Sequence, residues 1–201
     1  MKFYRSISIG KKYSTDKFFS VVIYGLFLVL MLLIISNKEN FHIDEISSYG
    51  LANHHDSLFI NFEDGKTYIP AGDPYLKYVT VSSDSKFDYE NVWKNQSSDV
   101  HPPLYYLLLH TICSFFPGRF SKWYAGIINI IFALMTLYVL RKLINHLLGE
   151  KESICNVVSL FLILSPGILS AVSFFRMYIM SMFWVTLLTE KMVKTVNQYQ
   201  I

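Results

Sequence analysis

Two short segments of the chain carry side chains that could perform acid–base chemistry. Asp44 and Glu45 are adjacent carboxylates, and Asp99 and His101 lie just before a Pro-Pro pair. A carboxylate with an orienting partner can act as a general base, and two carboxylates can also hold a divalent metal ion. The alternative for Asp44 is a helix N-cap, where its carboxylate would accept free backbone N–H groups.

The second segment is shaped by its prolines. A residue before proline is held extended, so His101 is expected to project from a stiff corner. The missing N–H groups of Pro102 and Pro103 suit the first turn of a helix. The alternative is a plain helix entry in which Tyr105 and Tyr106 form an aromatic belt at the membrane interface.

A lone arginine supplies the complementary charge. Arg176 is the single charged residue between Ile154 and Thr189. A charge inside an apolar run is costly and marks a functional site by default, although an interfacial arginine can also reach the headgroup region. A guanidinium can hold a phosphate through two parallel hydrogen bonds. Carboxylates, a histidine and an arginine on one membrane face could together displace a lipid-linked phosphate with an activated hydroxyl.

The composition indicates a membrane protein with one acidic segment. The chain has 201 residues, 52% apolar and 16% charged, which excludes a disordered chain. A net charge of +3 without a dense basic patch argues against a nucleic-acid partner. Residues 37–100 carry 5 Lys/Arg and 11 Asp/Glu, a net charge of −6, whereas the remainder carries 13 and 4, a net charge of +9. We expect such a partition when the acidic segment lies on the outer membrane face.

Uncharged runs predict the transmembrane helices. Residues 18–36 form such a run, and a helix of that length, about 28 Å, matches the hydrocarbon core. The run is too long for a typical signal peptide. A second run covers 123–140. The longer apolar stretch that follows contains a Ser-Pro-Gly breaker at 165–167, so it is divided into two spans, 151–170 and 174–194.

Charge asymmetry fixes the predicted topology. The apolar segment 102–116 is short for a span and typical of an interfacial helix. With this helix outside, ten Lys/Arg residues lie on the inner side, as the positive-inside rule requires. The prediction is an all-α integral membrane protein with about four transmembrane helices, an interfacial helix and a large acidic outer loop. It is a multi-pass protein of the cell membrane with both termini cytoplasmic. The predicted segments are a cytoplasmic N-terminus at 1–17, a first transmembrane helix at 18–36, an outer loop at 37–122 with the interfacial helix at 102–116, three further transmembrane helices within 123–194, and a cytoplasmic tail at 195–201.

Taken in order, these motifs resemble the C-type superfamily of membrane glycosyltransferases that use polyprenyl-phosphate sugars. The superfamily includes protein O-mannosyltransferases and lipid A aminoarabinose transferases. Its pattern is an Asp-Glu pair soon after the first span, a D-x-H-P-P-L segment before the next, and an arginine-tyrosine element after a Ser-Pro turn. The resemblance extends over residues 18–194. The matching positions are Asp44-Glu45, Asp99-Val100-His101-Pro102-Pro103-Leu104, Ser165-Pro166 and Arg176-Met177-Tyr178.

The resemblance implies catalytic roles for the Asp-Glu pair. Asp44 would be the base that takes the proton of the acceptor hydroxyl, and Glu45 would orient the acceptor or assist. The reaction would be an inverting displacement at the anomeric carbon, outside the cytoplasm. Members of the superfamily differ in metal use, so a divalent metal ion at Asp44 and Glu45 is left open, and no cofactor is assigned.

The resemblance also implies a substrate-binding group. Asp99 and His101 would shape the site, and Arg176 would hold the donor phosphate, with Tyr178 as its companion in the motif. The implied partners are a polyprenyl-phosphate-linked sugar and membrane lipids, with the acceptor left open.

Two departures from the family pattern keep other functions in view. Family members are usually much longer, so we expect the chain to be a fragment or a truncated product of such an enzyme. Tyr105-Tyr106 stand where protein O-mannosyltransferases tend to carry Gly-Lys, which argues against a protein acceptor. One alternative is a non-catalytic membrane subunit or degenerate relative. Another is a small lipid or solute transporter, which would use polar residues inside the spans such as Asn129, Thr136 and Asn156.

Overall fold

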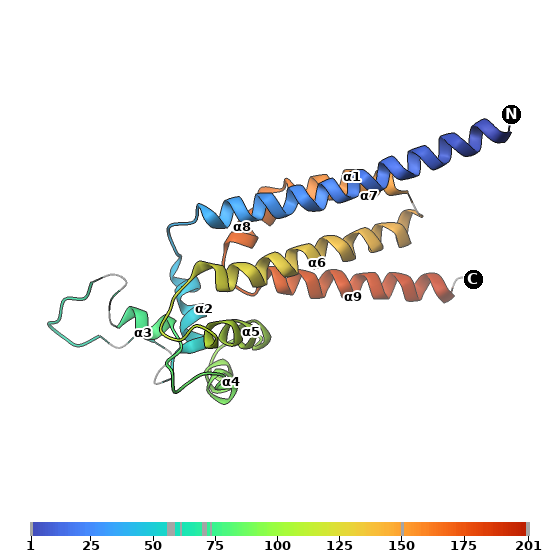
Figure 1. The fold of residues 1–201 in the computed structure, drawn as a ribbon. Coiled ribbons are helices and arrows are strands. Elements are labelled where there is room, and N and C mark those ends of the chain that lie inside the picture. Colours follow the sequence, from blue (N-terminus) through green and yellow to red (C-terminus); the bar gives the residue numbers. More distant parts are fainter. Residues whose placement is uncertain are drawn as a thin grey trace. The chain divides into compact units, whose positions relative to one another are not determined.

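The computed structural model describes residues 2–55, 59–60, 62–69, 72, 74–149 and 151–199, with side chains from residue 15 onward. Its regular elements are all helical within these residues (Figure 1). The helices are α1 (Lys2–Ser36), α2 (Ile43–Asn53), α3 (Tyr75–Val79), α4 (Tyr89–Ser97), α5 (Leu104–Ser114), α6 (Lys122–Leu148), α7 (Glu152–Ile163), α8 (Pro166–Ser173) and α9 (Tyr178–Tyr199).

The chain forms two compact units, which are described separately. Unit 1 comprises Met1–Asn37, Asn129–Ser173 and Tyr178–Ile201. Unit 2 comprises Lys38–Ile128 and Phe174–Met177. The predicted acidic outer loop therefore corresponds largely to unit 2, which also takes up a four-residue connection from much later in the chain.

Unit 1 is built on an apolar helix with one packed stripe. α1 lies against α7 and α8, and α8 lies against α9. Ile23, Phe27, Met31 and Ile35 follow one another at intervals of four and are fully or almost fully buried. Positions four apart lie on one face of a helix. The other faces of α1 expose large apolar side chains, as expected where lipid rather than protein covers a helix.

Two helices in the described residues are long and apolar enough to cross a membrane, namely Thr15–Ser36 within α1 and all of α6. They agree with the first two predicted spans. α7 and α8 together would make a third, but they are bent by 57°. The bend precedes Pro166, which cannot donate a helical hydrogen bond, so the predicted span 151–170 is two shorter helices. α9 coincides with the predicted fourth span, which stays a prediction because Glu190 and two lysines occupy its second half.

Unit 2 is organised around α2, which lies against α3, α4 and α5. The α2 residue Tyr49 is fully buried, and its hydroxyl donates to the Ser121 carbonyl at 2.8 Å and accepts from the Ala125 N–H at 3.2 Å. Gly50 permits the close approach of α3, because a Cβ there would lie 1.9 Å from a ring atom of Tyr78. The acidic segment thus folds around its own helical core.

Candidate functional site

Four of the six predicted site residues come together in unit 2. Asp44 lies in the first turn of α2, whereas Asp99 and His101 lie in the turn between α4 and α5. Arg176 lies in the connection 174–177 between α8 and α9. Tyr178, the first residue of α9, belongs to unit 1.

Arg176 is the centre of this group. Its Nη1 lies 2.8 Å from Oδ2 of Asp44, and its Nη2 lies 3.0 Å from Nε2 of His101. The arginine side chain is 8% exposed, whereas that of Asp44 is 43% exposed. The cation is therefore enclosed by protein, and the carboxylate is open to a second molecule. An arginine held at such a depth is costly unless it is paired, which favours a binding role over simple anchoring at an interface.

The contacts of His101 define its tautomer. Nδ1 lies 2.7 Å from Oδ2 of Asp99, while Nε2 faces the guanidinium of Arg176. A guanidinium can only donate, so Nε2 accepts and Nδ1 carries the proton that it donates to Asp99. Asp99, His101, Arg176 and Asp44 form one continuous hydrogen-bonded chain. The prolines after His101 position it at the entry of α5, as the sequence predicts.

Glu45 is buried and fully engaged by its neighbours. Oε2 accepts from the backbone N–H of His42 at 2.7 Å and from Nζ of Lys38 at 3.0 Å. Oε1 accepts from the backbone N–H of Phe175 at 2.8 Å. The alternative reading of Asp44 as the helix cap is wrong, because His42 caps α2 and Glu45 completes the capping box. The contacts of Glu45 favour a positioning role, and its predicted catalytic role stays a prediction.

Glu45→Gln is expected to lower the free energy of unfolding by about 2–3 kcal/mol, because a glutamine presents an NH2 group to a backbone donor and loses the ion pair with Lys38. The measurement is thermal unfolding in detergent. Glu39→Gln, at an exposed position six residues earlier, is the matched control and should leave the unfolding temperature unchanged. Equal unfolding temperatures for both variants would show that Glu45 does not fasten this site.

Two tyrosines beside the site are buried rather than placed in an aromatic belt. Tyr105 and Tyr106 are both 0% exposed, so the belt reading of this helix entry is wrong. Burial raises the pKa of Tyr106 to about 12, partly offset by the nearby Arg176 charge. Tyr106 therefore stays protonated at physiological pH and adds no negative charge beside the guanidinium. The burial of both tyrosines could not be predicted from their position soon after the proline pair, because any face of α5 could have been the buried one.

His110 in α5 makes unit 2 sensitive to acid. The side chain is 1% exposed, and burial lowers its pKa, opposed in part by the Ala52 backbone and by Asp88. The unfolded chain takes up a proton near pH 6.5, whereas the folded unit binds it only at lower pH. Folding stability is therefore complete above pH 6.5 and falls as the pH drops below it.

His110→Phe is expected to flatten the fall in unfolding free energy between pH 7 and pH 5, by up to about 1.4 kcal/mol per pH unit. Chemical unfolding at several pH values measures the slope. Lys86→Gln, at an exposed position of the same unit, is the control and should retain the wild-type slope, because lysine does not titrate between pH 5 and pH 7. An unchanged slope in the His110 variant would assign the acid sensitivity to other groups.

The geometry of Asp44 and Glu45 offers little support for a divalent metal ion bound between them. Asp44 contacts Arg176, whereas Glu45 accepts from Lys38 and two backbone N–H groups. Across the part of the chain that the structure describes, no group of three or more His, Cys, Asp or Glu side chains is arranged to hold a metal ion.

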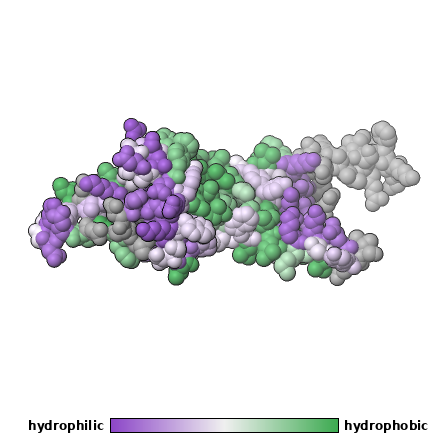
Figure 2. All heavy atoms as spheres, turned by 90° about the horizontal axis from the view of Figure 1, so that it is seen from below, coloured by the Kyte–Doolittle hydropathy of each residue, from purple (hydrophilic) through white to green (hydrophobic). Residues whose placement is uncertain are grey.

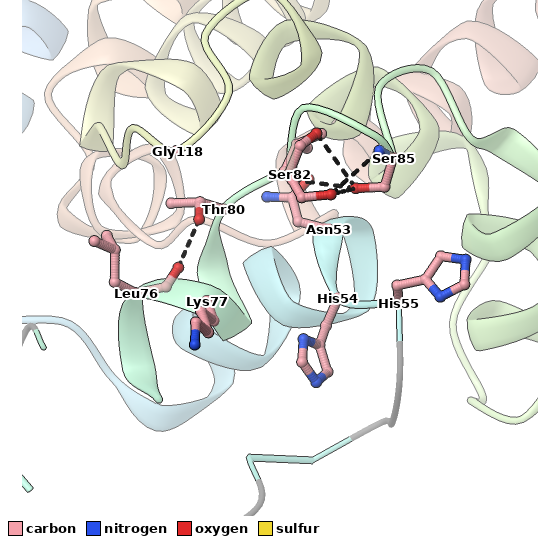
Figure 3. A pocket seen from close by; sticks show the side chains of 10 residues that line it. Asn53, His54, His55, Leu76, Lys77, Thr80, Ser82, Ser85 and Gly118 are labelled. Carbon is pink, nitrogen blue, oxygen red and sulfur yellow. Dashed lines mark hydrogen bonds between the residues drawn. The ribbon is translucent and has the colours of Figure 1, made fainter. Parts of the chain in front are cut away.

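A groove of about 400 Å³ opens elsewhere in unit 2 (Figure 3). His54 and His55 follow the C-terminal end of α2, Lys77 comes from α3, and Ser82 and Ser85 are hydrogen-bonded to each other at 2.7 Å. This groove could not be predicted from the sequence, because its residues come from segments without a recognisable motif.

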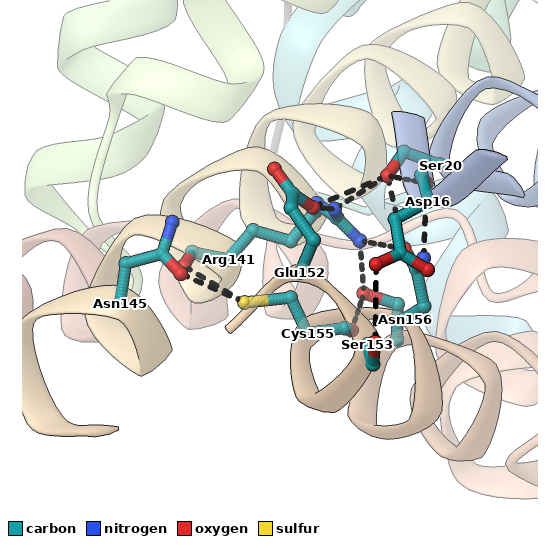
Figure 4. A network of polar contacts seen from close by, with 9 residues as sticks. Asp16, Ser20, Arg141, Asn145, Glu152, Ser153, Cys155 and Asn156 are labelled. Carbon is teal, nitrogen blue, oxygen red and sulfur yellow. Dashed lines mark hydrogen bonds and ion pairs between the residues drawn. The ribbon is translucent and has the colours of Figure 1, made fainter. Parts of the chain in front are cut away.

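Unit 1 contains a second buried arginine, Arg141, which directly follows the uncharged run 123–140. Arg141 is 9% exposed, and its guanidinium contacts Glu152 at 2.6 Å, Ser20 at 2.7 Å, Asn156 at 3.0 Å and Ser159 at 3.1 Å (Figure 4). The network joins α1, α6 and α7. Each of these polar groups forms a hydrogen bond or an ion pair with another one. In an apolar bundle this matters, because a buried polar group without a partner costs free energy. Asn156, considered above as a transporter residue, is thereby assigned a structural contact.

Arg141→Met is expected to lower the free energy of unfolding by about 2 kcal/mol, because it leaves Glu152 and three neutral polar side chains without their shared donor. Thermal unfolding in detergent measures the change. Lys142→Met is the matched control, since Lys142 is the next residue and is exposed. If the two variants unfold at the same temperature, the network does not hold the three helices together.

Comparisons of the chain with protein-family models, with curated proteins and with solved structures find no match. What bears on function is therefore the geometry of the Asp44, Asp99, His101 and Arg176 group, which we call the Arg176 site.

Proposed function

We propose that this chain is a membrane glycosyltransferase, or the N-terminal part of one, of the C-type superfamily. It would transfer a sugar from a polyprenyl-phosphate donor to an acceptor hydroxyl on the outer face of the cell membrane. The observation that supports this most is the enclosed guanidinium of Arg176 between the exposed carboxylate of Asp44 and the His101–Asp99 pair. In the proposed topology α1, α6, the α7–α8 pair and α9 cross the membrane, α5 lies at the outer surface and both termini are cytoplasmic.

The proposed reaction needs one cation and one base at the same place. The acceptor oxygen attacks the anomeric carbon, and the bond from that carbon to the phosphate oxygen breaks. The electron pair leaves with the polyprenyl phosphate, so negative charge grows on the leaving group, which Arg176 stabilises. The hydroxyl proton passes to Asp44, which acts as general base. Attack opposite the leaving phosphate inverts the configuration at carbon.

The contacts of Arg176 indicate how the donor would enter. Both terminal nitrogens are occupied by protein acceptors, Oδ2 of Asp44 at Nη1 and Nε2 of His101 at Nη2. A phosphate oxygen can replace the Asp44 carboxylate at Nη1, because that carboxylate is exposed and water can solvate it. The exchange would release Asp44 for the acceptor hydroxyl, so donor binding and base activation would be coupled. His101 and Asp99 would remain in place and act as positioning residues.

Donor binding tests this function directly. The detergent-solubilised chain is titrated with a polyprenyl-phosphate sugar such as polyprenyl-phosphate mannose, and in parallel with the corresponding polyprenol, which lacks the phosphate. Saturable binding of the phosphate-bearing lipid alone is the expected result. Equal affinity for both lipids, or no binding of either, would overturn a donor site on this chain and favour a non-catalytic membrane subunit.

A further inference from the structure

A cavity of about 300 Å³ lies in unit 1 between the last turns of α6 and the second half of α9. It is separate from the Arg176 site, which belongs to unit 2. Where Figure 2 shows unit 1, hydrophilic surface lies beside apolar surface. The lining residues are Lys142, Asn145 and His146 from α6 and Glu190, Lys191 and Lys194 from α9.

A buried carboxylate holds the two walls of the cavity together. The side chain of Glu190 is 3% exposed, its Oε1 lies 3.2 Å from Nε2 of His146, and its Oε2 lies 3.2 Å from Nζ of Lys191. Nδ2 of Asn197 donates to the His146 carbonyl at 2.8 Å. The contacts of His146 with Glu190 and Asn197 cross from α6 to α9, and the ring centroids of Phe132 and Phe183 lie 5.5 Å apart in the same interface. The cavity therefore has fixed walls.

The charge of the cavity favours an anion. Three lysines and one carboxylate line it, a net charge of +2 with His146 neutral. The carboxylate of Glu190 already faces His146 and Lys191, so it repels an incoming anion less than a free carboxylate would. Lys142 lies at the rim with Nζ 4.5 Å from the ring centroid of the exposed Tyr138. A phosphate group would be attracted by several lysines at once.

The surface beside the cavity is apolar. Ile131, Met135 and Tyr138 are 50%, 39% and 54% exposed, and they follow one another four and three residues apart along α6. Side chains at that spacing form one stripe on a helix. The stripe leads to Lys142, which follows Tyr138 by four residues and lines the cavity. A charged cavity at the end of an apolar stripe matches an amphiphile with an anionic head and hydrocarbon tails.

We propose that this cavity binds the phosphate headgroup of an anionic membrane phospholipid, whose acyl chain lies along the Ile131–Tyr138 stripe. Basic pockets between transmembrane helices at the membrane surface are suited to such headgroups. The bound lipid would bridge α6 and α9 and stabilise unit 1. The inference depends on these helices lying in a membrane and does not depend on glycosyl transfer.

Lipid-dependent unfolding of the delipidated chain in detergent tests the proposal. Dioleoyl-phosphatidylglycerol is expected to raise the unfolding temperature saturably, whereas zwitterionic dioleoyl-phosphatidylcholine and inorganic phosphate are expected to have little effect. Native mass spectrometry counts the lipids that remain bound. In the Lys191→Gln/Lys194→Gln double variant, phosphatidylglycerol should bind more weakly by a factor of about 10, given roughly fivefold for each lysine near a membrane surface reduced by screening.

Lys17→Gln/Lys151→Gln is the matched control, because it removes two exposed cations of unit 1 that do not line the cavity. It should retain wild-type affinity for phosphatidylglycerol. An equal loss in both double variants, or equal stabilisation by phosphatidylcholine, would overturn a specific headgroup site. Stabilisation by inorganic phosphate as strong as that by phosphatidylglycerol would overturn the lipid as the ligand. Lys194→Gln alone, at an exposed position, provides the same comparison if the double variant does not fold.

Discussion

Arg176→Ala is expected to weaken binding of the polyprenyl-phosphate sugar about 100-fold. A hydrogen bond to a charged group contributes about 1.5–3 kcal/mol, and loss of the charged donor Nη1 removes about 2.7 kcal/mol, which is a factor of about 100 in affinity. The Asp44 carboxylate, left behind by the arginine, would also repel the anionic donor. Titration of the donor in detergent, on protein that retains its helical circular dichroism, measures the affinity.

The matched controls for Arg176 separate charge from geometry. Arg119→Ala removes an exposed arginine of unit 2 and should leave donor affinity unchanged. Arg176→Lys keeps the charge but loses the planar pair of donors, so its affinity should lie between those of wild type and the alanine variant. Wild-type affinity in Arg176→Ala would exclude this arginine as the phosphate ligand.

Asp44→Asn is expected to lower the transfer rate about 10³-fold while donor affinity is retained or increased. The rate falls because an amide cannot take up the hydroxyl proton, and general bases contribute about 10²–10⁴ to such reactions. Affinity is retained because the asparagine oxygen still accepts from Arg176 but no longer competes as an anion for the guanidinium. The two readouts therefore move in different directions, which a merely structural defect would not produce.

The Asp44 experiment requires both measurements on the same preparation. Sugar transfer is followed as release of the polyprenyl phosphate in membranes from cells that produce the variant, and donor affinity is measured as above. Glu39→Gln, which removes an exposed carboxylate at the start of unit 2, should change neither quantity. If Asp44→Asn transfers sugar at the wild-type rate, another group is the base. If it loses donor binding along with transfer, its role is in the integrity of the site.

The two predictions together examine the coupling in the Arg176 site. The carboxylate and the phosphate compete for the same nitrogen of Arg176, since Asp44 now lies 2.8 Å from Nη1. In Asp44→Asn/Arg176→Ala the donor affinity should rise slightly above that of Arg176→Ala, because the repelling carboxylate is gone, but it should stay far below that of wild type, because no guanidinium holds the phosphate. An affinity restored to the wild-type level would show that the arginine serves to neutralise Asp44 and does not bind the donor.

Much of the helical architecture could be predicted from local sequence. An uncharged run of span length determines a membrane-compatible helix whatever surrounds it, as α1 and α6 show. Proline also acts locally, so the breaks before α5 and α8 follow from their sequences. α9 is different. The charge of Glu190 argues against a membrane span when the sequence is considered alone. In the structure its side chain is buried against His146, a residue that lies 44 positions away in sequence.

The candidate site divides in the same way. The residue types and the order of Asp44, Asp99, His101 and Arg176 identified them as a group, because charge and proline context are local properties. Their contacts are not local, since Arg176 lies 75 residues from His101 in sequence. Only the packing of the 174–177 connection onto α2 brings them within hydrogen-bonding distance.

The sequence by itself determined which residues could carry charge chemistry and which segments suit a membrane, because both depend on side-chain type and on spacing along one helix. Only the tertiary structure decided which side chain of the Asp-Glu pair is buried and which is exposed. Successive residues of a helix point about 100° apart. One turn of α2 therefore buries Glu45 against the backbone of Phe175 and leaves Asp44 exposed beside Arg176. Which partner each of these two side chains contacts depends on tertiary packing, and the order of neighbouring residues in the sequence does not specify it.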